Sequence, residues 1–159
     1  MRLTFWIGFW IFLLDQVSKY IVLYGIKLES QPGQTYDVFA PFLTLRMAWN
    51  RGVNFGLFAE LDMRWVLIAL ALFISVFVVW WIQREKVGRW AHISAGLLIG
   101  GALGNVVDRV VHGAVADFLN MSCCGINNPY AFNIADISIF AGAIGLVLFT
   151  DNGNKKKTA

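Results

Sequence analysis

The sequence contains few charged residues, few histidines and few cysteines. Only 14% of the 159 residues are charged and 58% are hydrophobic, a balance far from that of soluble globular domains. With two histidines and no His-Glu-x-x-His pattern, a zinc site is not expected. The net charge of +3 requires no nucleic-acid partner. The composition therefore indicates a membrane protein, and it calls for no metal or other cofactor.

The only two cysteines, Cys123 and Cys124, are adjacent. Outside the membrane they can form a strained vicinal disulfide, pair between chains or remain thiols. A Cys-His nucleophilic pair with His112 lacks a recognisable third group to orient it. A Ser-Lys dyad of Ser18 and Lys19 is also disfavoured, because adjacent helical residues face apart. Nucleophilic catalysis by these residues is therefore not predicted.

Four stretches are long and apolar enough to cross a bilayer, which requires roughly 20 apolar residues. They are about Leu3–Tyr24, Trp65–Ile82, Trp90–Val111 and Ala131–Phe149. No small-x-small cleavage site follows the first stretch, so we expect a retained helix rather than a signal peptide. The sequence thus predicts an all-α integral membrane protein. Residues 1–150 would form a single four-helix domain, and residues 151–159 a basic cytoplasmic tail.

Basic residues in the short connecting segments predict the orientation of the chain. They lie at the N-terminus, between the second and third stretches and in the C-terminal tail: Arg2, Arg84, Lys86, Arg89, Lys155, Lys156 and Lys157. In the long segment Gly25–Arg64, basic and acidic residues balance. We therefore expect both termini in the cytoplasm, with this long loop and the Arg109–Tyr130 loop outside.

The long first loop has a pattern of its own. Residues Phe42–Asn50 alternate between apolar and polar side chains, as in a half-buried strand. Asn50-Arg51-Gly52 then indicates a turn. Leu57–Trp65 mixes apolar and charged residues, which suits a short interfacial helix. We expect the loop, residues 25–64, to form a small β-containing insert and a flap over the membrane surface.

Several polar residues interrupt the apolar stretches, where ionisable side chains are rare and usually functional. The helical rise places all of them in the outer half of the bilayer: Asp15, Lys19, Asn105, Asp108, Asn133 and Asp136. Asp15 and Lys19 are four residues apart and can simply neutralise each other on one helix face. Arg109, at the water boundary, can extend toward water or clamp a carboxylate of another element. Asp136, with Asn133 expected on the same helix face, is harder to explain by a structural role.

Glycines repeat at four-residue spacing in the third stretch, which creates a face of small residues suited to close helix contact in lipid. The glycines there are Gly96, Gly100, Gly101 and Gly104. Ala141 and Gly145 are the expected mating residues on the fourth stretch. Such packing would draw the third and fourth stretches together.

That packing would also bring Asp108, Asp117 and Asp136 toward one another. Two carboxylates that meet at one membrane face cannot both ionise easily, so one proton is shared between them. Paired carboxylates of this kind are the machinery of aspartic hydrolases. The residues therefore favour an aspartic-type hydrolase.

Five segments form an ordered set: Asp15-Gln-Val-Ser-Lys19, Asn50-Arg-Gly-Val-Asn-Phe-Gly56, Gly100-Gly-Ala-Leu-Gly-Asn-Val-Val-Asp-Arg109, Gly113-Ala-Val-Ala-Asp-Phe118 and Phe132-Asn-Ile-Ala-Asp136. The set resembles lipoprotein signal peptidase, the signal peptidase II family of bacterial membrane aspartyl proteases. The last three segments together are highly specific, and the resemblance covers nearly the whole chain. Asn54 departs from the family, which usually has a small residue there, and this affects the local flap contact.

The resemblance implies an aspartic endopeptidase whose catalytic pair is Asp117 and Asp136. Its supporting and substrate-binding residues would be Asp15, Lys19, Asn50, Arg51, Gly52, Asn105, Asp108, Arg109 and Asn133. The implied substrate is a prolipoprotein whose lipobox cysteine carries diacylglycerol, cleaved just before that cysteine. The implied location is the bacterial cytoplasmic (inner) membrane, with the site near the extracytoplasmic face. Membrane lipid is the other expected partner, and no obligate protein partner is expected.

Other classes of function would use some of the same residues. A small proton-coupled transporter also places ionisable groups within its spans, but no inverted repeat is evident and the polar groups cluster in one half. A non-catalytic assembly factor could bind partner helices through the glycine face. A family member with a different substrate would keep both aspartates.

Overall fold

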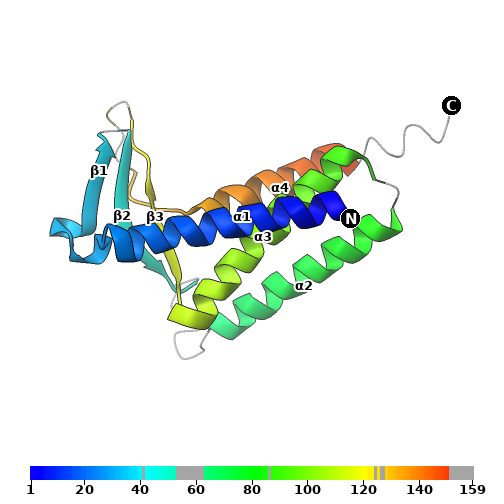
Figure 1. The fold of residues 1–159 in the computed structure, drawn as a ribbon, viewed down its shortest axis with the longest axis horizontal. Coiled ribbons are helices and arrows are strands. Elements are labelled where there is room, and N and C mark those ends of the chain that lie inside the picture. The colour runs from blue at the N-terminus through cyan, green and yellow to red at the C-terminus, as the bar shows by residue number, and fades with distance from the viewer. Residues whose placement is uncertain (41, 53–62, 86, 124, 126–127, 151–159) are drawn as a thin grey trace.

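The computed structural model describes residues 1–40, 42–52, 63–85, 87–123, 125 and 128–150. Its helices are α1 (Arg2–Tyr20), which continues into a π-helical turn η1 (Ile21–Gly25), α2 (Met63–Arg84), α3 (Arg89–His112) and α4 (Ile134–Thr150). Its strands are β1 (Thr35–Phe39), β2 (Leu43–Asn50) and β3 (Val115–Asn120). Short 3-10 turns η2 (Leu28–Ser30) and η3 (Pro32–Gln34) join η1 to β1. The helices form a bundle with the sheet at one end and the N-terminus near the other (Figure 1).

Three of the described helical segments are long and apolar enough to cross a membrane: Arg2–Ser30, Met63–Arg84 and Arg89–His112. The second has the highest mean hydropathy, 2.6, and its residues between Arg64 and Arg84 carry no charge. α4 is also apolar but has only 17 residues. The first three predicted stretches are therefore confirmed as helices, and the fourth is shorter than predicted.

The row Gly96, Gly100 and Gly104 of α3 packs against α1, whereas the sequence analysis expected its mating residues on the fourth stretch. A Cβ on Gly100 would lie 2.9 Å from the Cα of Gly8, and a Cβ on Gly96 would lie 2.7 Å from the Cβ of Ile7. Residues four apart lie on one side of a helix, so Gly104 continues the same row and approaches Asp15 of α1. This face lets the backbones of α1 and α3 touch.

α4 uses a different side of α3. Gly101, one residue along from the α1-facing row, would meet the carbonyl of Ala135 if it carried a Cβ. From α4, Gly142 and Gly145 approach Ser94 and the turn that follows it. The predicted mate Ala141 is exposed, whereas Gly145 does contact α3 as expected. α3 is thus the central helix, with α1 and α4 on separate faces.

α2 packs chiefly against α3. It begins at Met63, so residues 63–65 belong to this helix rather than to the predicted interfacial helix Leu57–Trp65. Residues 57–62 and the rest of the predicted flap lie outside the described residues, as does Asn54. The Arg64 guanidinium lies 4.7 Å from the Trp65 ring centre, within the range of a cation–π contact.

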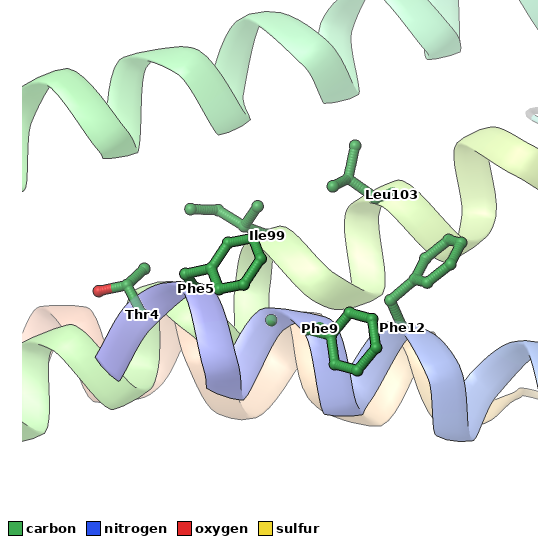
Figure 2. A pocket seen from close by; sticks show the side chains of 7 residues that line it. Thr4, Phe5, Phe9, Phe12, Ile99 and Leu103 are labelled. Carbon is green, nitrogen blue, oxygen red and sulfur yellow. The ribbon is translucent and has the colours of Figure 1, made fainter. Parts of the chain in front are cut away.

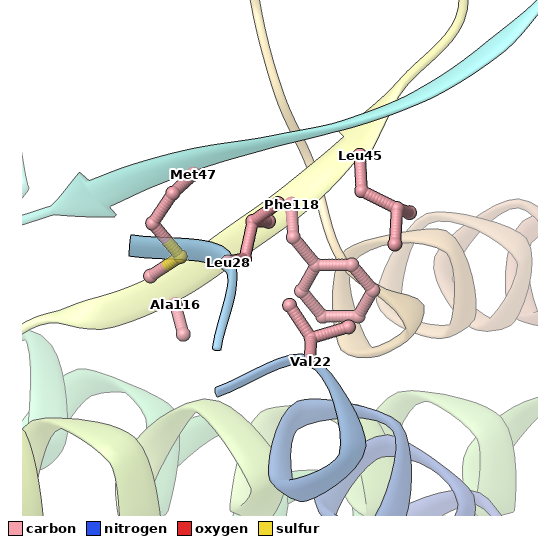
Figure 3. Packing of buried hydrophobic residues seen from close by; sticks show 6 residues of the cluster. All are labelled: Val22, Leu28, Leu45, Met47, Ala116 and Phe118. Carbon is pink, nitrogen blue, oxygen red and sulfur yellow. The ribbon is translucent and has the colours of Figure 1, made fainter. Parts of the chain in front are cut away.

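The sheet has the order β1-β2-β3, with antiparallel pairing throughout. The predicted strand in Phe42–Asn50 is confirmed as β2, and its alternation buries Leu45 and Met47. Figure 3 shows Leu45 and Phe118 pointing from the strands toward Val22, which follows α1. This apolar cluster fixes the sheet on the end of α1.

β3 was not predicted, and it comes from the segment between α3 and α4. Five of its six residues are buried, so the strand shows no alternation of apolar and polar side chains to reveal it. The fold is consequently not purely helical, since the sheet joins the segment between α1 and α2 to the segment between α3 and α4. β3 also carries Asp117.

Candidate active site

Polar side chains from four elements meet where the bundle adjoins the sheet. α1, α3, β3 and the start of α4 contribute the buried residues Asp15, Lys19, Asn105, Asp108, Asp117 and Asn133. Asp136 is half-buried beside them. Buried polar groups are stable only when they are hydrogen-bonded or paired, and each of these residues has such a partner.

Asn133 and Asp136 form the reciprocal cap that begins α4. The Asp136 backbone N–H donates to Asn133 Oδ1 at 2.9 Å, and the Asn133 backbone N–H donates to Asp136 Oδ2 at 3.2 Å. This is a capping box, in which the first residue and the residue three further on satisfy each other's backbone. The helix therefore begins at Ile134 and not at the predicted Ala131. Asn133 precedes the helix rather than sharing a helical face with Asp136.

Asn133 also contacts the second aspartate. Its Nδ2 donates to Asp117 Oδ1 at 2.7 Å and to the carbonyl of Ala116 at 3.3 Å. Asn105 Nδ2 donates to Asp136 Oδ1 at 3.0 Å. One residue, Asn133, thus holds Asp136 through its backbone and Asp117 through its side chain.

Backbone pairing explains why Asn133 reaches β3. Phe132 exchanges hydrogen bonds with Leu119 at 3.0 and 2.8 Å, as an isolated bridge beside the sheet. Asp117 lies two residues before Leu119 and opposite Ala48 of β2. The segment before α4 is therefore paired with β3 through this bridge.

Lys19 joins two carboxylates across α1 and α3. Its Nζ lies 2.7 Å from Asp15 Oδ2 and 2.8 Å from Asp108 Oδ2, and 3.3 Å from Asn105 Oδ1. The predicted Asp15–Lys19 pair is confirmed, but it also includes Asp108. All three charged side chains are almost fully buried, so removing one would leave an uncompensated buried charge.

The remaining candidate residues lie at the edges of this cluster. Arg109 Nη1 donates to the carbonyl of Asn105 at 3.2 Å, and in the described part of the chain it forms no ion pair with a carboxylate. Asn50 supplies a side-chain hydrogen bond to Asp117. The predicted turn is confirmed, because the Gly52 N–H donates to Asn50 Oδ1 at 3.0 Å. Arg51 is exposed.

The environment of Asp117 favours its protonated form. Burial is the largest cause, and the negative charge of Asp136 adds to it; together they raise the pKa of Asp117 from 3.8 to about 7. Hydrogen bonds from Asn50 and Asn133 and the charge of Lys19 act in the opposite direction. Near neutral pH Asp117 can therefore carry a proton.

Gln16 was absent from the predicted site. Its Nε2 lies 3.1 Å from Asp15 Oδ2, 3.2 Å from Asp108 Oδ1 and 3.3 Å from the Gly104 carbonyl. The available signal was its position directly after Asp15, within the segment Asp15-Gln-Val-Ser-Lys19. Among the described residues, no group of three or more His, Cys, Asp or Glu side chains is suited to hold a metal ion.

An apolar groove of about 250 Å³ runs between α1 and α3, on the N-terminal half of α1. Figure 2 shows Phe5, Phe9 and Phe12 along α1, with Ile99 and Leu103 on α3. Thr4 is its only side chain with a polar atom, and its Oγ1 is hydrogen-bonded to His92 Nδ1 at 3.0 Å. The groove is therefore suited to apolar groups.

Comparison with known proteins identifies the family. The model of the signal peptidase (SPase) II family matches residues 7–150. The chain belongs to the signal peptidase II family. It is therefore a peptidase and a multi-pass membrane protein, and the resemblance carried by the five sequence segments is confirmed.

Individual relatives agree with the family match. The chain is 39% identical over 152 residues to a lipoprotein signal peptidase of Methylobacterium radiotolerans, covering 92% of this chain and 85% of the relative. It is 38% identical over 155 residues to one from Aeromonas hydrophila, covering 96% and 90%. A bacterial membrane enzyme solved by the in meso method has 28% identity and a TM-score of 0.79, covering 100% of this chain and 94% of that one.

Proposed function

We propose that this signal peptidase II removes signal peptides from diacylglyceryl-modified prolipoproteins, cleaving before the lipid-modified cysteine with Asp117 and Asp136. The observation that carries this proposal is the arrangement around Asn133, which contacts both carboxylates. The family and its relatives, named lipoprotein signal peptidase, support the substrate class. An Asp117 pKa of about 7 supports a shared proton at working pH.

Catalysis needs one ionised and one protonated carboxyl. The ionised aspartate takes a proton from a water molecule as the water oxygen attacks the scissile carbonyl carbon. The protonated aspartate donates a hydrogen bond to the carbonyl oxygen, where negative charge develops. The carbon–nitrogen bond then breaks, and the leaving amine receives a proton from the dyad. No covalent intermediate forms.

The surrounding residues orient the two carboxyl groups. Asn105 and the Asn133 backbone each donate to one oxygen of Asp136, which restricts the rotation of that carboxyl. Asn133 Nδ2 does the same for Asp117. Fixed donors of this kind need no reorganisation during the reaction. Arg109 contributes positive charge that interacts with both aspartates.

The proposed placement in the membrane follows from the basic segments and the bundle. α4 serves as the fourth span, both termini lie in the cytoplasm, and the sheet lies at the extracytoplasmic face of the bacterial inner membrane. The N-terminus and the sheet stand at opposite ends of α1 (Figure 1), as this orientation requires. The apolar groove beside Phe5 and Phe9 then offers a surface for the signal peptide within the lipid.

Mass analysis of the products tests the substrate and the bond. Purified chain is incubated with a prolipoprotein carrying diacylglyceryl on its lipobox cysteine, and with the same protein lacking the lipid. The proposal predicts a free signal peptide and a mature chain beginning at the lipid-modified cysteine, from the lipidated substrate only. Cleavage at another bond, or equal cleavage of both substrates, would contradict it.

A further inference from the structure

Each candidate catalytic aspartate follows a residue whose backbone is held by a buried carboxylate. The Ala135 N–H, just before Asp136, donates to Asp15 Oδ1 at 3.0 Å. The Ala116 N–H, just before Asp117, donates to Asp108 Oδ2 at 3.2 Å. Asp15 and Asp108 therefore anchor the two backbone segments that carry the dyad.

These two anchors are linked to each other by only two side chains in the described structure. Lys19 contacts Asp15 Oδ2 and Asp108 Oδ2. Gln16 Nε2 contacts Asp15 Oδ2 and Asp108 Oδ1. Lys19 supplies the charge, but a single ammonium can pivot between two carboxylates. A second donor that contacts a different oxygen of Asp108 removes that freedom.

We propose that Gln16 is a positioning residue of the dyad. Its amide ties Asp15 to Asp108, and through them it sets the separation of the segments that carry Asp136 and Asp117. This role rests on the proposed function, because it assumes that the two aspartates carry the reaction. The contacts of Gln16 are with Asp15 and Asp108 and not with Asp117 or Asp136, so Gln16 acts through the two anchors and not on substrate.

Two substitutions at this position separate hydrogen bonding from packing. Gln16→Met keeps the length of the side chain and removes the donor. Gln16→Glu keeps the shape, and the new carboxyl can donate only while it is protonated. The charged groups around it are Asp15 and Lys19 of α1 and Asp108 of α3. The control is Gln83→Met, at an exposed position near the end of α2.

Initial rates of prolipoprotein cleavage are measured against pH for these variants, with folding checked by thermal unfolding in detergent. Losing a hydrogen bond of ordinary strength corresponds to about a two- to tenfold loss in rate. We expect Gln16→Met to lose kcat at every pH with KM unchanged, and Gln83→Met to match wild type. The cleavage rate of Gln16→Glu should approach that of wild type at acidic pH. As the pH rises, it should decline at a lower pH than the wild-type rate does.

The pH profile of Gln16→Glu also decides the question if Gln16→Met does not fold. If both variants lost the same factor in cleavage rate at every pH, Gln16 would contribute through packing alone, and the positioning role would be overturned. Wild-type rates in both would overturn it too, while the proposed function stands. Failure of wild type itself to cleave the lipidated substrate would overturn the proposed function, and the positioning role with it.

Discussion

Replacing Gly100 with alanine tests the contact between α1 and α3 that underlies the site. A Cβ at this position would lie 2.5 Å from the Gly8 carbonyl oxygen and 2.9 Å from its Cα. Both are backbone atoms, so no side-chain rotation can relieve the clash. Carbon atoms in contact prefer about 3.5 to 4.0 Å. The two helices must therefore move apart by roughly 0.6 Å or more at this point.

The expected cost is that of overpacking a close interface, about 1–3 kcal/mol. Part of it comes from the Lys19–Asp108 pair, which spans the same two helices at 2.8 Å. Gly25→Ala is the matched control, because its Cβ would meet only a side-chain carbon of Ile21 at 3.8 Å. In a helical segment this change is neutral or stabilising by up to about 1 kcal/mol.

Unfolding of both variants in mixed micelles, followed by circular dichroism, gives the two free energies of unfolding. Cleavage of the prolipoprotein by each variant is measured below its unfolding midpoint. We predict that Gly100→Ala loses both stability and rate, and that Gly25→Ala keeps both. A Gly100→Ala protein as stable as wild type would refute the direct backbone contact between α1 and α3.

Three further predictions concern the dyad, the cap of α4 and the groove. Burial and the negative charge of Asp136 raise the Asp117 pKa from 3.8 to about 7, so the folded state favours the protonated form of Asp117. The contribution of this group to the free energy of unfolding is therefore fully present below about pH 4 and is lost as the pH rises through about 7. Cleavage should likewise fall above about pH 7 as the shared proton is lost, and a flat pH–rate profile from 5 to 9 would contradict this. Asn133→Ala removes a helix cap and the Asp117 contact, so it should cost about 1 kcal/mol of stability and reduce kcat. Asn128→Ala, outside the dyad, should keep the wild-type kcat. Unfolding and rate measurements on both variants check this prediction. Leu103→Trp narrows the apolar groove and should raise the KM for prolipoprotein several-fold. Phe73→Trp, on the exposed side of α2, should leave the KM unchanged. Equal KM values for the two variants would show that the substrate does not bind in the groove.

The membrane helices could be predicted because lipid imposes a simple rule on composition. The first three apolar stretches have lengths and hydropathies that leave few alternatives to a spanning helix. The fourth stretch was predicted to begin three residues too early, at Ala131 instead of Ile134, because hydropathy does not detect a helix cap. Asn133 ends the extended segment by bonding to the Asp136 N–H, and that bond depends on local geometry. The pattern Asn-x-x-Asp does, however, match a capping box.

Partners between elements were harder to predict than the elements themselves. The glycine row of α3 was recognised, but its spacing does not reveal which helix it faces, and Gly8 of α1 is a single glycine without a repeat. The strand that carries Asp117 was also difficult to predict, because β3 is buried and shows no alternation of apolar and polar side chains. Asp15 and Lys19 were correctly paired from helical spacing alone, whereas the addition of Asp108 required the packing of α1 on α3.

The measurement that tests the central claim most directly is prolipoprotein cleavage by Asp117→Asn and Asp136→Asn. The control is Asp37→Asn, at an exposed position on β1 where the carboxylate accepts a hydrogen bond from Thr44. All three proteins are first shown to unfold at temperatures close to that of wild type. The shared-proton mechanism predicts that Asp37→Asn cleaves at the wild-type rate and that neither dyad variant cleaves detectably. Cleavage at the wild-type rate by a folded Asp117→Asn or Asp136→Asn protein would contradict it.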